Sequence, residues 1–135
     1  MTAWCHGAAG ILLARAGGLE SLDTPEVQAD IADALRAVLR YEGPGSDHLC
    51  CGRCGRAEAL LVAGERLGRP ELAEAAQTLV ARLLAEKAHA GAFVLGGAPP
   101  GAPPAPGLFQ GLAGVGYTLL RLARPDELPC LLLWE

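Results

Sequence analysis

Three cysteines and a histidine are the residues of this sequence best suited to chemistry. Cys5 is followed by His6, and Cys50 and Cys51 are adjacent further along the chain. Thiolate and imidazole are the ligands that Zn²⁺ prefers, and three protein ligands leave the fourth tetrahedral position open, as in catalytic sites. Three thiols at one point would suit such a site, although an adjacent Cys pair is not a usual zinc-finger spacing. Buried cysteines often serve only as small apolar residues, so packing is the alternative.

A repeated motif indicates how these distant cysteines could meet. Three segments align without gaps, and each contains Gly-x-x-Gly and leads into an apolar run. The segments begin at Trp4, Leu49 and Leu108. Repeats in a closed ring place equivalent positions around a common axis, so Cys5 and Cys50 are predicted to face each other with Cys51 beside Cys50. The equivalent positions of the third segment hold Phe109 and Gln110, of which only Gln110 could approach a metal.

Helices of two kinds are predicted to position these segments. Thr24 as N-cap and Pro25 as first residue begin one amphipathic helix, and Pro70 begins another. Their apolar stripes are predicted to consist of Val27, Ile31, Leu35, Val38 and Leu39, and of Leu72, Ala76, Leu79, Val80, Leu83 and Leu84. The helices after each Gly-x-x-Gly are apolar around more of their circumference, which is typical of buried helices. These predicted buried positions are Leu60, Leu61, Val62 and Leu67, and Tyr117, Leu119, Leu120 and Leu122.

The alternation of buried and amphipathic helices predicts an all-α fold, an α/α solenoid or toroid with inner and outer layers. Two glycines one helical turn apart are expected to let backbones approach without a Cβ clash. A Pro/Gly-rich loop is expected from Gly96 to Gly107, and the tail after Pro129 could be extended.

Other polar and sulfur-containing residues leave several interpretations open. Cys51 and Cys54 could be a redox pair or half of a zinc ribbon, but no second C-x-x-C exists, so Cys54 is expected to pack inside a helix. Cys130 is also expected to pack. His6 could be a fourth ligand, a proton donor or a core histidine, and His48 is expected to be solvated in a polar loop.

The three segments together resemble the lanthionine synthetase C family. The Trp-Cys-His-Gly sequence at 4–7 is similar to that family's W-C-x-G motif, and Cys-Cys-Gly at 50–52 is similar to its C-H-G or C-C-G motif. The end of the chain, from Gly107 to Asp126, resembles the closing repeat of the class II enzymes. The resemblance spans essentially the whole chain, which is interpreted as the C-terminal portion of a cyclase domain over residues 1–135.

The resemblance implies a toroid of inner and outer helices, of which this chain would supply the last three inner helices and the intervening outer ones. It implies Cys5, Cys50 and Cys51 as ligands of Zn²⁺, with Cys51 where many members have His. The implied reaction adds a Cys thiolate of a precursor peptide to dehydroalanine or dehydrobutyrine, forming a lanthionine thioether. The family's further acid–base residues lie on earlier helices, so the N-terminal part of the cyclase or a full-length synthetase is the expected partner. Arg53 stands where a small polar residue is expected.

Composition limits the other functions. The net charge is −4 and Lys87 is the single lysine, which is unlike a nucleic-acid-binding surface. No targeting segment is evident and the apolar tail is too short to cross a bilayer, so a cytoplasmic protein without a transmembrane segment is expected. A zinc-holding module that binds a peptide without catalysis and a helical scaffold with incidental cysteines remain alternatives. A glycosidase is disfavoured because no acid pair lies at equivalent helix starts.

Overall fold

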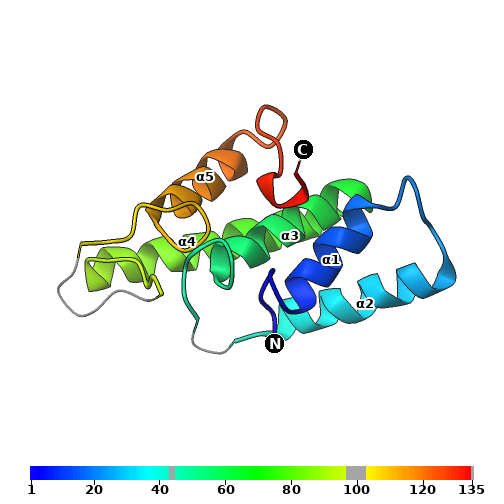
Figure 1. Cartoon of the computed structure of the whole chain (residues 1–135), viewed down its shortest axis with the longest axis horizontal. Helices are drawn as coiled ribbons and strands as arrows, with labels where there is room; N and C mark the ends of the chain where they lie inside the picture. Colours follow the sequence, from blue (N-terminus) through cyan, green and yellow to red (C-terminus); the bar gives the residue numbers. More distant parts are fainter. Residues whose placement is uncertain (43–44, 97–102, 135) are drawn as a thin grey trace.

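The computed structural model describes residues 1–42, 45–96 and 103–134, and within them every regular element is helical. The elements are α1 (Ala8–Gly17), α2 (Pro25–Arg40), α3 (Arg53–Arg66), α4 (Pro70–Ala90), α5 (Leu112–Ala123) and a short 3-10 helix (Leu131–Leu133). Helix α3 contacts α1, α4 and α5, and α2 packs on α1 (Figure 1). The predicted all-α fold is therefore confirmed, and α1, α3 and α5 each begin directly after a Gly-x-x-Gly segment's first glycine.

The outer helices α2 and α4 begin where the sequence predicts. The Val27 amide donates to Thr24 Oγ1 over 3.3 Å, which satisfies one of the free amides of the first turn of α2. Helix α4 begins at Pro70 and ends before Gly91, whose φ of 82° is a left-handed conformation that favours glycine. Most residues of the predicted stripes are buried, whereas Leu79 is partly buried and Leu39 and Leu84 are exposed.

The inner helices differ from one another in burial. Helix α3 has α1, α4 and α5 around it, and most of its residues are buried, including Leu60, Leu61 and Val62. Helix α5 rests on α3 along one side, and its Leu120 is exposed. The prediction that inner helices are buried on most sides is confirmed for α3 and is wrong for α5 in the described chain.

The second glycine of each motif makes room for the chain that precedes its helix. A Cβ atom at Gly10, Gly55 or Gly114 would overlap a backbone carbonyl oxygen. Those oxygens belong to the first residue of each repeated segment, namely Trp4, Leu49 and Leu108. The segment therefore folds back onto its own helix, and this close approach requires glycine in all three repeats.

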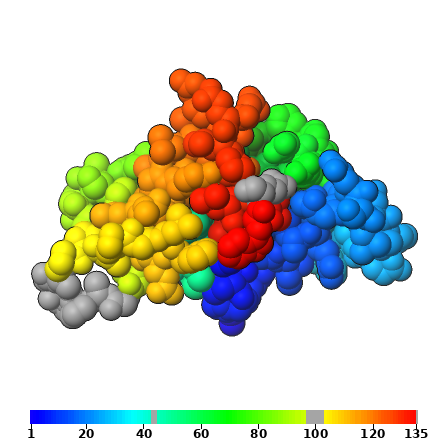
Figure 2. All heavy atoms as spheres, turned by 45° about the horizontal axis from the view of Figure 1, so that its top comes forward, coloured from blue at the N-terminus to red at the C-terminus, as the bar shows by residue number. Residues whose placement is uncertain are grey.

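The end of the chain packs beside its beginning (Figure 2). The tail after Pro129 forms a 3-10 helix, so the expectation of an extended tail is wrong. It turns because buried Leu132 and partly buried Leu133 must face the core near α1. The predicted loop at 96–107 has no helix or strand at 103–107, and its residues 97–102 lie outside the described part of the chain.

Candidate metal centre

Backbone hydrogen bonds join the three repeated segments side by side. The Trp4 amide donates to the Cys50 carbonyl over 3.0 Å, and the Cys50 amide donates to the Phe109 carbonyl over 2.8 Å. The rings of Trp4 and Phe109 stack with their centroids 5.7 Å apart. Cys50 and its neighbour Cys51 are therefore held between the first and third segments, at the starts of the inner helices.

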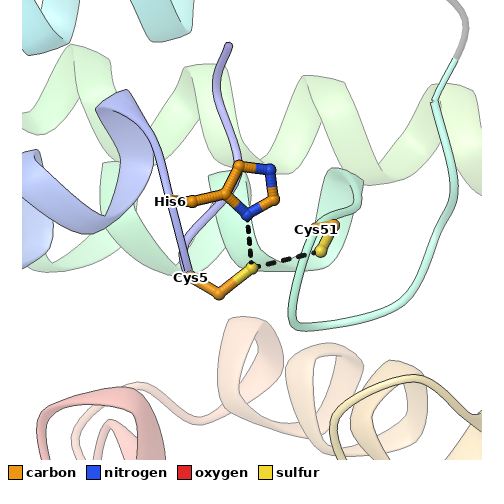
Figure 3. Close-up of side chains that lie close together, drawn as sticks. All are labelled: Cys5, His6 and Cys51. Carbon is orange, nitrogen blue, oxygen red and sulfur yellow. Dashed lines mark hydrogen bonds between the residues drawn. The ribbon is translucent and has the colours of Figure 1, made fainter.

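The cysteine side chains meet where these segments adjoin. Cys5 Sγ lies 3.3 Å from Cys51 Sγ, which lies 3.4 Å from Cys50 Sγ. His6 Nδ1 lies 2.8 Å from Cys5 Sγ, and Figure 3 shows the Cys5 sulfur joined by dashed lines to the His6 ring and to Cys51. The repeat alignment predicts this meeting, and the Cys51 sulfur contacts both of the other sulfurs.

The donor set fits a soft metal ion. Donor atoms of Cys5, His6 and Cys51 all lie within 4.8 Å of one another, and Cys50 adjoins them through Cys51. A tetrahedral zinc with Zn–S bonds of about 2.3 Å separates its sulfur ligands by about 3.8 Å. The two Sγ–Sγ distances are slightly shorter than that, so small side-chain rotations would open the thiols around one ion. The cluster could therefore hold a metal ion, with four candidate donors.

The thiols are accessible from the surface. Cys5 and His6 are exposed, while Cys50 and Cys51 are half-buried. The exposure of His6 removes the interpretation of a core histidine and leaves those of a ligand and a proton donor. An open, sulfur-rich surface can admit a further ligand, which a closed structural site cannot.

The three thiols differ in how readily they ionise. Burial opposes ionisation of Cys5, but hydrogen bonds from Cys50, Cys51 and His6 outweigh it and lower the pKa of Cys5. Burial, with the hydrogen bonds and negative charge that its neighbours contribute, raises the pKa of Cys50 to about 12. Burial also raises the pKa of Cys51. Without a cation, the cluster thus favours one thiolate, and binding two or three thiolates would require a metal's positive charge.

His48 lies beside the Cys50–Cys51 turn and is buried, so the prediction that it is solvated is wrong. Its side chain is only 4% exposed, and its Nδ1 accepts a hydrogen bond from the Cys51 amide over 3.3 Å. Burial lowers the pKa of His48, while a hydrogen bond to the Phe109 backbone and the Asp47 charge partly oppose this. The imidazole therefore joins the Cys51 turn to the third segment, a contact between distant parts of the chain that sequence spacing does not reveal.

An ion pair between Arg53 and Asp47 also stabilises this turn. Asp47 accepts from Arg53 Nη2 over 2.6 Å and from the Val94 amide over 2.7 Å. Arg53 also reaches Glu86 of α4 over 2.6 Å. Arg53, which departs from the expected small residue, thus ties the start of α3 to α4 and to the segment that follows α4.

The remaining candidates lie away from the cluster. The side chain of Cys54 is fully buried, and burial raises its pKa to about 12, so its predicted packing role is confirmed and a redox partnership with Cys51 is not favoured. Cys130 is likewise fully buried, as predicted. Gln110 is exposed in the third segment.

The sequence model of the family described as lanthionine synthetase C-like protein matches residues 1–133. No curated protein matches the chain. Among the described residues, no helix is long and apolar enough to cross a membrane.

Proposed function

Since the chain belongs to the lanthionine synthetase C-like family, we propose that it takes part in forming lanthionine thioethers in a precursor peptide. The proposed setting is lantibiotic-type peptide modification in the cytoplasm, where thiols stay reduced. The proposed partners are the precursor peptide and the remainder of a cyclase domain, whose further inner helices would supply acid–base groups. The observation that carries the proposal is the cluster of accessible thiols at the junction of the repeated segments.

The proposed cofactor is Zn²⁺, held by Cys5, Cys50 and Cys51. The three thiols adjoin one another at distances near those of zinc-bound sulfurs, and the family motifs coincide with them. When bound, the ion would lower the pKa of a substrate thiol so that its thiolate forms near neutral pH.

The proposed reaction is the addition of a peptide thiol across a C=C bond of the same peptide. The peptide's cysteine sulfur forms a C–S bond to the β-carbon of a dehydroalanine or dehydrobutyrine in the same peptide. The electron pair of the C=C bond moves to the adjacent carbonyl as an enolate, and the α-carbon then takes a proton. The thiol loses one proton and the product gains one, so no oxidant or reductant is needed.

His6 is the residue of this chain best placed to move a proton. Its exposed imidazole has Nδ1 2.8 Å from Cys5 Sγ, so it borders the position that a substrate sulfur would occupy. We propose that it accepts the substrate thiol's proton or protonates the enolate. His48 and the Asp47–Arg53 pair do not face this position, and we propose that they position the Cys50–Cys51 turn.

The direct test is thioether formation by the zinc-supplied chain together with separately produced earlier helices of a class II cyclase domain. A peptide with one dehydroalanine and one cysteine would be incubated with both parts. Cyclisation leaves the peptide mass unchanged but removes its free thiol, so N-ethylmaleimide labelling followed by mass spectrometry reports the product. We expect loss of labelling that requires both parts.

The matched control compares Cys51→Ser with Cys54→Ser. Cys51→Ser is expected to abolish cyclisation, whereas Cys54→Ser, at a buried position away from the cluster, should retain it. Zinc binding and peptide retention without loss of the thiol would favour a binding module. A folded chain that binds no zinc would favour a scaffold and contradict the proposal.

A further inference from the structure

A cavity of the described chain lies apart from the thiols, between α2 and α4. It measures about 700 Å³, and residues of α3 lie among its lining. Its apolar lining comes from Val38, Leu39, Leu60, Leu79 and Val94, and its cationic lining from Arg53, Arg56 and Arg82. This volume is within the range of small-molecule sites, which combine apolar walls with a few polar groups.

Two of these arginines lie one turn apart at the start of α3 but differ in their partners. Arg53 has two carboxylates, Asp47 and Glu86, each 2.6 Å away. Arg56 has the Tyr41 carbonyl at 3.2 Å and the Tyr41 ring at 4.6 Å from its guanidinium carbon. Within the described residues, no carboxylate lies at ion-pair distance from Arg56.

The position of Arg56 makes the lack of a carboxylate partner energetically unfavourable. Its side chain is 5% exposed, and a buried charge without a counter-charge is strongly disfavoured. The first turn of a helix also carries a partial positive charge, which disfavours a cation there. Burial lowers the pKa of Arg56, Tyr41 partly opposes this, and the Arg53 charge adds to the lowering. The net lowering agrees with a cation that lacks a carboxylate partner.

We propose that the cavity between α2 and α4 binds a small molecule with an oxyanion head and an apolar body, with Arg56 as the principal counter-charge. The oxyanion, a carboxylate or a phosphate, would supply the charge that Arg56 lacks, and guanidinium matches both in bidentate geometry. The apolar body would lie along Leu79 and Val38. Arg82, exposed at the rim, would add a second and weaker attraction.

The acidic residues of the cavity limit which anions fit. Glu86 already pairs with Arg53, and exposed Glu42 lies in the lining without an ion pair to Arg56. An extended polyanion would meet these carboxylates at the rim, whereas a single head group can reach Arg56. The site therefore favours small anions over nucleic acid, and it does not depend on the proposed thioether chemistry.

The test is a titration of the chain with phenyl phosphate and, separately, with benzoate, at constant ionic strength. Amide chemical shifts in NMR spectra give the site, and isothermal calorimetry gives the affinity. We expect saturable binding of at least one probe, with shifts concentrated in residues 38–41, 53–60 and 78–82. The stronger probe identifies the head group, and inorganic phosphate tests whether the apolar body contributes.

Three variants decide the role of Arg56. Arg56→Gln is expected to weaken binding about 10-fold or more, because it removes a charge-assisted hydrogen-bond donor, and Arg82→Gln about 3-fold. Arg36→Gln, on the exposed surface of α2 in an ion pair with Asp33, is the matched control and should change nothing. If Arg56→Gln does not fold, the chemical-shift changes of the wild type and the affinity of Arg82→Gln still test whether the probe binds in the cavity. No saturable binding, shifts outside the cavity, or equal weakening by Arg36→Gln would overturn the proposal.

Discussion

Cys51 and Cys54 lie within one turn of the start of α3 and belong to two contrasting regions. Cys51 belongs to the thiol cluster, formed by Cys5, His6, Cys50 and Cys51 on loops that precede helices. Cys54 belongs to a buried polar cluster of α3, α5 and the tail. That cluster consists of Cys54, Glu58, Thr118, Arg121 and Cys130.

The difference lies in exposure and in what each sulfur contacts. In the thiol cluster, sulfurs contact sulfurs at the surface, and one pKa is lowered. In the buried polar cluster, Glu58 and Arg121 pair across α3 and α5 at 3.4 Å, and the cysteines fill space beside them. The same residue type therefore offers ligands where the loops expose it and packing volume where the helix buries it.

The largest effect is expected from a substitution that blocks the close approach of the Leu49 carbonyl to α3, on which the position of the thiol cluster depends. Gly55→Ala puts a Cβ into the Leu49 carbonyl oxygen and is expected to destabilise the chain by about 3 kcal/mol or more. Gly116→Ala, in α5, has open space around the new Cβ and should be neutral or stabilise by up to about 1 kcal/mol. Urea unfolding followed by circular dichroism measures both. Equal stabilities of the two variants would contradict the role assigned to the glycine motif.

The next largest effect is a pH dependence of stability that arises from Glu58 in the buried polar cluster. Burial raises the pKa of Glu58 to about 7, although Arg121, Thr118 and Cys130 oppose this. The folded state therefore binds the Glu58 proton more tightly than the unfolded state, whose pKa is near 4.5. Stability from this residue is present at low pH and falls by up to about 3 kcal/mol as pH rises from about 4.5 to 7, then levels.

The measurement is the free energy of unfolding of the wild type and of Glu58→Gln across this pH range. Gln does not titrate, so the difference between the two curves isolates Glu58 and cancels contributions such as that of His48. A difference that stays constant with pH would show that Glu58 ionises normally in the fold.

A smaller effect is expected from the histidine behind the thiols. His48→Ala removes the acceptor for the Cys51 amide and should weaken zinc binding about 10-fold, as loss of residues that orient ligands commonly does. His48→Asn can present an oxygen near the position of Nδ1 and should retain most of the affinity. Competition with a chromophoric zinc chelator gives the dissociation constants. Indistinguishable affinities for His48→Ala and the wild type would remove His48 from the account of the site.

The sequence predicted features that depend on local rules. Thr24 and Pro25 begin α2 through capping geometry, and the repeated glycines mark where the inner helices start. Apart from the meeting of the thiols, which the repeat alignment predicts, it did not reveal contacts between residues distant along the chain. Glu58 pairs with Arg121 from another helix. His48 was expected to be solvated because it lies in a loop with polar neighbours, but its contacts with the Cys51 turn bury it. Leu39 and Leu84 fit helical periodicity but lie at the edges of stripes that no other described element covers.

The most direct test of the contrast between the two clusters is zinc stoichiometry of the purified chain under reducing conditions. The wild type, Cys51→Ser and Cys54→Ser would be compared by atomic emission after removal of loosely bound metal. We predict about one zinc per chain in the wild type and in Cys54→Ser, and almost none in Cys51→Ser, with all three folded. Zinc that persists in folded Cys51→Ser, or that is lost equally from Cys54→Ser, would contradict the assignment of the metal centre to the thiol cluster.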